Sequence, residues 1–238
     1  MSEDTAQPER KPLFAPYRGV RFATSFKWLF AGVLAYALLL MVMIAANPRD
    51  ASLPIVGPSL YLTPVFGLPL VLRLVHKPGR LRRLIYFMVL LPIAHIAANY
   101  LAWSYAVPNF YQSDPQEVLL RHLITGAWGG LAGATLSFTL LYLFGLTARR
   151  RAELGTMTLA TIALTVIGAL GMAQGLILSG ETMDTHHTEP LILWFETVHL
   201  PWQTVFALTV AWLMRPPKAR NQRASKESKT GDLKQPIG

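Results

Sequence analysis

The chain has 238 residues, of which 52% are hydrophobic and only 15% are charged, and it contains no cysteine. Soluble domains usually carry about 25% charged residues, so the composition indicates a membrane protein. Without cysteine, disulfides, thiolate metal sites and cysteine nucleophiles are all excluded.

Six long segments lack lysine and arginine, and each reaches the length of about 20 residues that a helix needs to cross a bilayer. We therefore predict an all-α fold, a polytopic helical bundle with six transmembrane spans. The predicted domains are a basic cytoplasmic tail (1–27), the transmembrane domain (28–214) and a second basic cytoplasmic tail (215–238). The predicted spans are Trp28–Asn47, Leu53–Leu72, Leu84–Val107, Leu123–Leu146, Met157–Gly180 and Leu191–Met214.

The positive charges predict the orientation of this bundle. Of the 22 lysines and arginines, 20 lie before span one, between spans two and three, between spans four and five, or after span six. Positive residues collect on the cytoplasmic side, so both termini are predicted to be cytoplasmic. The same rule explains the net charge of +9 without nucleic acid as a partner. Membrane lipids are the expected partners, because Arg18, Arg21 and Lys27 precede span one at the depth of anionic headgroups.

The start of the chain does not have the pattern of a cleaved signal peptide. Its polar leader is long, and the apolar run that follows exceeds the usual signal-peptide core of about 7–15 residues. We interpret the first span as an uncleaved anchor. The composition suits a multi-pass protein of a bacterial cell inner membrane.

Span two is unusual in its helix-breaking residues. Each internal proline removes one backbone hydrogen bond from a helix, and non-helical backbone at membrane depth must be covered by protein or face a water-filled cavity. We predict that this segment is kinked, broken or partly re-entrant. Its prolines and glycines are Pro54, Gly57, Pro58, Pro64, Gly67 and Pro69.

Small residues in spans four and five predict close helix packing. Span four contains two Gly-x-x-x-Gly pairs, and such pairs permit close approach of a neighbouring backbone. Span five has glycines at similar spacing, so we expect the two spans to pack tightly together. The pairs are Gly126 with Gly130 and Gly129 with Gly133, and the span-five glycines are Gly168, Gly171 and Gly175.

Span six carries the most unusual polar pattern. Glu196, His199 and Gln203 follow each other at i, i+3 and i+7, which places them on one helical face. An ionisable group at membrane depth is costly unless it faces a cavity or a partner. Pro201 also leaves the carbonyl of Thr197 without its helical donor. This polar face beside a loosened backbone is where we expect function.

Other polar residues fall at similar predicted depth, in the external half of the bilayer. His95 and Asn99 lie four residues apart in span three, and Gln174 lies in span five. One interpretation is that these groups only hydrogen-bond the helices together. The other is a substrate or proton site of a small transporter, reached from outside, in which the two three-span halves are inverted repeats. The predicted site residues are Glu196, His199, His95, Asn99, Gln174 and Gln203.

Two further functions remain open from the sequence. The chain could be an accessory or assembly subunit of a larger membrane complex, with membrane-protein partners or a second copy of itself. It could also be a redox protein with haem b as cofactor and His95 and His199 as axial ligands, since paired histidines from different helices hold such haems. A divalent metal on the external loop, through Asp184, His186, His187 and Glu189, is less favoured than an ordinary solvated loop.

An enzyme is not the favoured interpretation. The sequence has no Walker A motif, no carboxylate-rich motif of nucleotidyl-lipid enzymes and no retinal-type lysine inside a span. We therefore predict no catalytic residues.

Overall fold

A computed structural model describes residues 19–46, 57–109, 114–147, 151–179 and 188–216. Of these residues 87% are helical and none forms a strand, so the predicted all-α fold is confirmed. The elements are α1 (Phe22–Ala46), α3 (Pro58–Tyr61), α4 (Thr63–Arg73), α5 (Arg80–Ile85), the π-helical segment η1 (Tyr86–Leu90), α6 (Leu91–Ala106), α7 (Pro115–Leu143), α8 (Arg151–Ser179) and α9 (Thr188–Leu213).

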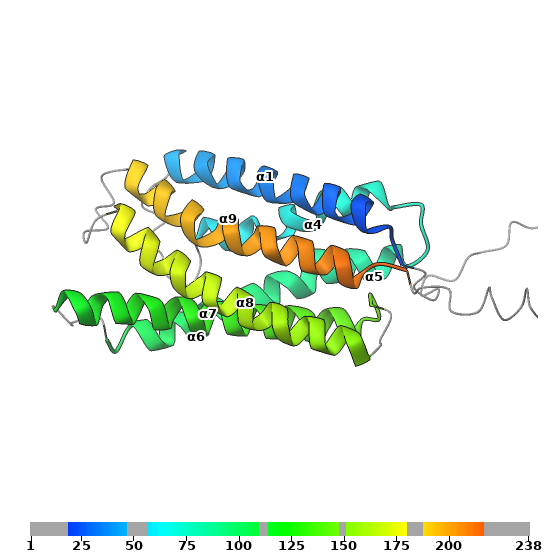
Figure 1. The fold of residues 1–238 in the computed structure, drawn as a ribbon. Coiled ribbons are helices and arrows are strands. Elements are labelled where there is room, and N and C mark those ends of the chain that lie inside the picture. The colour runs from blue at the N-terminus through cyan, green and yellow to red at the C-terminus, as the bar shows by residue number, and fades with distance from the viewer. Residues whose placement is uncertain (1–18, 47–56, 110–113, 148–150, 180–187, 217–238) are drawn as a thin grey trace, which may run out of the picture.

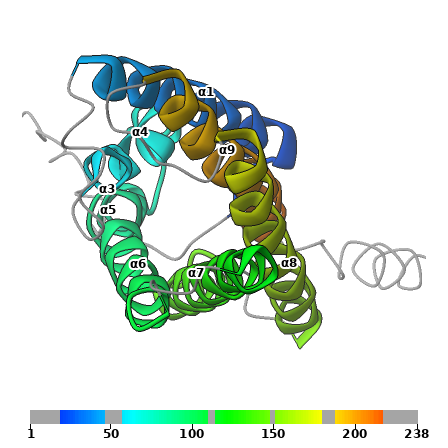
Figure 2. The same ribbon diagram turned by 90° about the vertical axis from the view of Figure 1, so that its left-hand side faces the viewer.

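The helices form a closed ring, which Figure 2 shows from one end of the bundle. Helix α1 packs against α9, α9 against α8, α8 against α7, and α7 against α6. The segment α4 then contacts η1, α6 and α1, which closes the ring. In the side view the long helices run side by side along one axis (Figure 1). Such a ring leaves an interior that the side chains of several helices share.

Four helices are long and apolar enough to cross a membrane: α1, the continuous run Arg80–Ala106, α7, and Ala152–Leu178 of α8. By their length and composition these four helices are compatible with an integral membrane protein. Helix α9 has 26 residues, but Glu196, His199 and Gln203 lower its mean hydropathy. Segment α4 has only 11 residues. The count of six spans therefore stays a prediction.

The predicted second span is divided between α3 and α4. Leu62 separates the two helices, Pro64 lies in the first turn of α4, and Pro69 lies inside it. Gly67 allows the ring of Phe87 to lie directly against the α4 backbone, because a Cβ at this glycine would overlap that ring. The kinked or re-entrant path predicted for the whole stretch stays a prediction, since residues 47–56 lie outside the described part of the chain.

A buried arginine holds the turn between α4 and α5. The guanidinium of Arg83 is 1% exposed, and it donates to the carbonyls of Leu74, Lys77 and Pro78 at 2.9, 3.0 and 2.9 Å. These carbonyls follow the end of α4, where helical carbonyls lack partners and the helix dipole favours a positive charge. The arginine therefore acts as a cap for the end of α4.

Several helices extend beyond their apolar runs. Helix α1 begins at Phe22 and not at Trp28, and α7 begins at Pro115 and not at Leu123. Helix α7 therefore begins eight residues before the predicted fourth span. Asp114 caps α7 by accepting a hydrogen bond from the backbone N–H of Gln116 at 2.8 Å, so the helix starts where the cap lies.

The tight packing of α7 against α8 is confirmed. A Cβ at Gly126 would overlap the carbonyl of Gly168, and a Cβ at Gly130 would lie 2.5 Å from the carbonyl of Leu164. The second pair behaves differently. A Cβ at Gly129 or Gly133 would meet α6 or Trp202 only at ordinary contact distances of 3.4–3.5 Å, and these two glycines face the interior of the ring.

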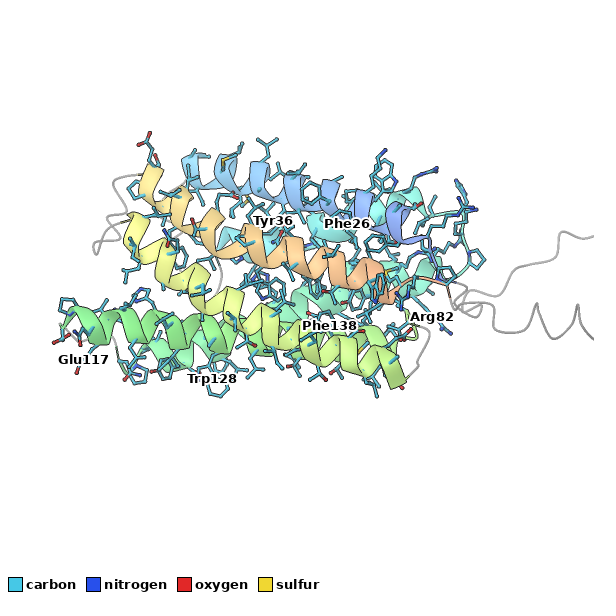
Figure 3. The ribbon with its side chains drawn as sticks, viewed as in Figure 1. Phe26, Tyr36, Arg82, Glu117, Trp128 and Phe138 are labelled. Atoms are coloured by element: carbon cyan, nitrogen blue, oxygen red, sulfur yellow. The ribbon has the colours of Figure 1, made fainter. Side chains whose placement is uncertain are left out.

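The two ends of the described chain meet at one end of the bundle. The backbone N–H of Val20 donates to the carbonyl of Met214 at 2.9 Å. Arg82 marks this end in Figure 3, and Glu117 marks the opposite one. The two termini thus start from the same side of the bundle, which is the side that the charge distribution predicts to be cytoplasmic.

Candidate functional site

A cavity of about 590 Å³ lies inside the helix ring. It reaches the start of α7 at Arg121 and His122 and the end of α6 at Ala106, so it extends to the bundle end that is predicted to be external. Its walls come from α3, α4, α6, α7, α8 and α9. Ligand cavities usually measure about 300–1,000 Å³ and combine apolar walls with a few polar groups. The polar or ionisable residues along it include His95, Asn99, Arg121, His122, His199 and Gln203.

His95 projects from α6 and is held by α4. Its Nδ1 lies 2.7 Å from Oγ1 of Thr63, and the Thr63 hydroxyl in turn donates to the carbonyl of Ser59 at 3.2 Å. With the Thr63 proton in the hydrogen bond to Ser59, Nδ1 of His95 is the donor to Thr63. The neutral ring then keeps a lone pair on Nε2. His95 therefore offers an acceptor or ligand atom from a fixed ring.

His199 of α9 meets His95 across the ring of helices. The two imidazole centroids are 5.7 Å apart, with the ring planes at 69°. On its other sides His199 contacts the rings of Tyr36 and Phe195, at centroid distances of 6.0 and 5.9 Å. Both histidines line the cavity. The structure thus brings together two residues from predicted spans three and six.

Tyr36 links the same region to α1. Its side chain is 1% exposed, and its hydroxyl donates to the carbonyl of Ser59 at 3.2 Å. The Ser59 carbonyl therefore accepts from both Tyr36 and Thr63. Figure 3 shows Tyr36 between α1 and α9. One carbonyl of the short helix α3 joins the polar groups of α1 and α4.

The predicted site residues do not all reach the cavity. His95, Asn99, His199 and Gln203 line it. Glu196 is half-buried and close enough to Tyr36 for an electrostatic interaction, and its Oε1 is buried with no hydrogen-bond partner among the described residues.

Gln174 lies apart from this site, because its side chain is exposed on α8. The carbonyl of Thr197, which Pro201 frees, also lies on the α8 side, against Gly171. The carbonyl that Pro201 leaves without a helical donor is therefore part of the contact between α9 and α8. On the predicted external loop, Glu189 is the one described member of the suggested metal ligands, and the others lie outside the described residues. No group of three or more metal-ligating side chains occurs in the described part of the chain.

The charge of the cavity differs from the sequence expectation. Among its described lining residues Arg121 is the one permanently charged side chain, and none is a carboxylate. Arg121 also donates to the carbonyl of Asn109 at 2.8 Å, which fixes it at the end of the cavity. Such walls suit a neutral or anionic molecule, because a cation would have no carboxylate to replace its hydration.

Aromatic side chains close the other half of the ring. Phe206 is 1% exposed, and its ring lies 5.6 Å from Phe66, 5.4 Å from Phe138 and 5.0 Å from Trp202, measured between centroids. Below this group the hydroxyl of Tyr86 donates to a backbone carbonyl of α7 at 3.1 Å. Phe138 lies in this half in Figure 3. The cavity is therefore blocked towards the end where the termini meet.

Sequence reasoning missed two site residues. These are Thr63, in the proline-rich stretch of span two, and Tyr36, in span one. The sequence signal for Thr63 is its hydroxyl directly before Pro64, at a position where a helix can begin. Comparisons with protein families, with characterised proteins and with solved structures find no match.

Proposed function

We propose that the protein is a small transporter of a bacterial inner membrane, with both termini cytoplasmic and a substrate cavity that is entered from outside. The observation that carries the proposal is the cavity itself, which reaches one end of the bundle and is blocked at the other by Phe206 and its neighbours. A binding site near the middle of the membrane that faces one side at a time is the arrangement of secondary transporters. In this proposal the sixth span is α9 and the Pro/Gly-broken second span contains α3 and α4.

The substrate is a neutral or anionic organic molecule with an apolar body. Aromatic walls such as Trp103 and Trp202 suit that body, while Arg121 supplies positive charge at the cavity end. Hydrogen bonds to Asn99 and Gln203 orient the molecule. Glu196, which the sequence groups with the substrate or proton site, is not part of the lining that receives this molecule.

Glu196 has the separate role of coupling to protons. It interacts electrostatically with Tyr36 and is not among the residues that line the cavity, while the ring of Tyr36 contacts His199 of the lining. A carboxylate at such a place can change its charge while the substrate site stays free of negative charge. Gln174, exposed on α8, has no part in this role.

The natural absence of cysteine allows a direct test. Asn99→Cys places one thiol on the cavity wall, and a membrane-impermeant methanethiosulfonate is applied to right-side-out and to inside-out membrane vesicles. A transporter exposes the thiol to both sides, with less labelling from the cytoplasmic side. Labelling from the outer side alone, at every pH tested, would contradict transport.

A second variant tests proton coupling. Glu196→Gln removes the carboxylate and keeps the shape, so the ratio of inner to outer labelling should lose its dependence on pH. An unchanged pH dependence would exclude Glu196 from the coupling. The accessory-subunit function stays a prediction, and migration of the native protein in a discrete large assembly on native gels would favour it.

A further inference from the structure

The pair formed by His95 and His199 is not explained by a substrate that needs only hydrogen bonds. Two imidazoles from different helices face one cavity, and no carboxylate or third histidine joins them to complete a metal site in the described part of the chain. A bare transition-metal ion usually takes about four ligands in a protein site. Two ligands suffice when the metal already has four nitrogens of a macrocycle, as in haem.

The spacing of the two rings fits such a ligand. A metal–imidazole bond of about 2.0 Å places each ring centroid about 3 Å from the metal, so two axial imidazoles have centroids about 6 Å apart. The observed distance is 5.7 Å. The two rings are therefore at nearly the centroid separation of an axial pair, and the planes at 69° allow each ring to stand upright on a flat macrocycle. The cavity volume of about 590 Å³ is in the range of pockets that hold organic ligands.

The hydrogen bonding of His95 prepares it as a ligand. Metal-bound histidines almost always donate their second N–H to a fixed oxygen, which sets the tautomer and the ring orientation. Nδ1 of His95 lies 2.7 Å from Oγ1 of Thr63, and the Thr63 hydroxyl donates a hydrogen bond to the Ser59 carbonyl, which leaves Nδ1 as the donor to Thr63. The remaining nitrogen, Nε2, is thereby the ligand atom. Nothing in helix packing alone requires this relay.

The walls beside the pair suit a flat molecule. Gly129 and Gly133 of α7 have no side chains, and they face Ala102 and Ala98 of α6 at ordinary contact distance. All four residues line the cavity. Small residues on two facing helices let the surface of a planar ring approach the backbones closely.

We propose that this cavity binds a b-type haem with His95 and His199 as axial ligands. The inference rests on the cavity of the proposed function and not on transport through it. A bound haem would be the ligand of that cavity, held by two iron–nitrogen bonds, with its porphyrin ring against the aromatic and glycine-lined walls. Arg121 is placed to attract its carboxylates from the cavity end.

The test titrates ferric haem into the purified full-length protein in detergent. The expected result is saturation at one haem per chain, with the spectrum of a six-coordinate low-spin iron and sharp visible bands after reduction with dithionite. The variant with both His95→Ala and His199→Ala should show only the weak, unsaturable uptake of haem by detergent. Equal saturable binding by that variant would overturn the proposal, and so would unsaturable uptake by the unaltered protein.

Two further variants separate ligation from folding. His76→Ala removes an exposed histidine that is not part of the cavity lining, and it should leave the spectrum and affinity unchanged. Thr63→Val removes the oxygen that orients His95, and it should weaken binding by about 10-fold or more while the low-spin spectrum is retained. Circular dichroism of each variant verifies the helical content. An affinity unchanged in Thr63→Val would contradict the orienting role.

Failure of the haem proposal is distinct from failure of transport. A protein that does not bind haem can still expose its cavity to both sides of the membrane. A protein that binds haem can expose its cavity to one side only. The absorption spectrum and the cysteine labelling therefore test different statements about the same cavity.

Discussion

Thr63 of α4 and His95 of α6 are joined by a hydrogen bond of 2.7 Å between Oγ1 and Nδ1. This bond connects the proline-rich stretch to the candidate site. The short helix α4 also contributes Phe66, whose ring contacts Phe206 in the aromatic group that closes the cavity. One helix therefore contacts both the candidate site and the closed end of the cavity.

The first prediction concerns the strength of that bond. Thr63→Val keeps the shape of the side chain but leaves Nδ1 of His95 without its acceptor, and an unmade hydrogen bond at a buried group costs about 1–3 kcal/mol. The free energy of unfolding, measured by titration with a denaturing detergent, should fall by that amount. Thr158→Val is the control, because its exposed hydroxyl donates only within its own helix, to the carbonyl of Leu154. Equal losses in the two variants would contradict the account.

Helix packing at Gly126 gives the second prediction. Gly126→Ala adds a Cβ that would overlap the carbonyl of Gly168, so α7 and α8 must separate. Overpacking of this kind costs about 1–3 kcal/mol, measured as a lower midpoint of thermal unfolding in detergent. Gly155→Ala on α8 has no atom within 4 Å of the new Cβ and should be neutral or slightly stabilising. A stable Gly126→Ala would contradict the close contact.

Arg83 gives the third prediction. Arg83→Lys keeps the charge but cannot make the three forked hydrogen bonds to carbonyls after α4. Hydrogen bonds from charged groups contribute about 1.5–3 kcal/mol each at most, so unfolding should become easier by about 2 kcal/mol. Arg80→Lys, at an exposed position on the same short helix, should have almost no effect. Since both changes preserve charge, insertion and orientation are unaffected.

The fourth prediction concerns the closed half of the ring. Phe206→Ala removes the ring that contacts Phe66, Phe138 and Trp202, and truncating a buried phenylalanine costs about 3–5 kcal/mol. Beyond this loss of stability, a thiol at position 99 should become more reactive towards an impermeant reagent on the cytoplasmic side. Leu208→Ala, on the exposed face of the same helix, should change neither property. No gain in cytoplasmic labelling would show that Phe206 does not close the path.

The sequence predicts the helices better than it predicts the site. Apolar length located α1, α6, α7 and α8, and small residues predicted the contact at Gly126, because both signals depend on composition alone. Counting along the helices also placed His95 and His199 at compatible depths. Depth does not give rotation about the helix axis, since a helix in lipid is apolar on all sides and shows little periodicity.

For that reason Gln174 was grouped with residues that it does not meet, and Glu196 was expected in a cavity beside which it lies. The short helices were also beyond prediction. Nothing in the prolines themselves indicates that Ser59 accepts from both Thr63 and Tyr36, because that contact depends on where the break places one carbonyl. Tertiary placement decides this part of the site.

The most direct measurement compares two adjacent positions on α6. Asn99 lines the cavity, whereas Tyr100 is 55% exposed on the outer face of the ring, where it would contact lipid. Each is replaced by cysteine in the otherwise cysteine-free chain, and intact cells are treated with an impermeant thiol reagent that needs water to reach a reactive thiolate. The account predicts labelling of Asn99→Cys and protection of Tyr100→Cys. Protection of both, or faster labelling of Tyr100→Cys, would contradict a water-accessible cavity that opens to the outside.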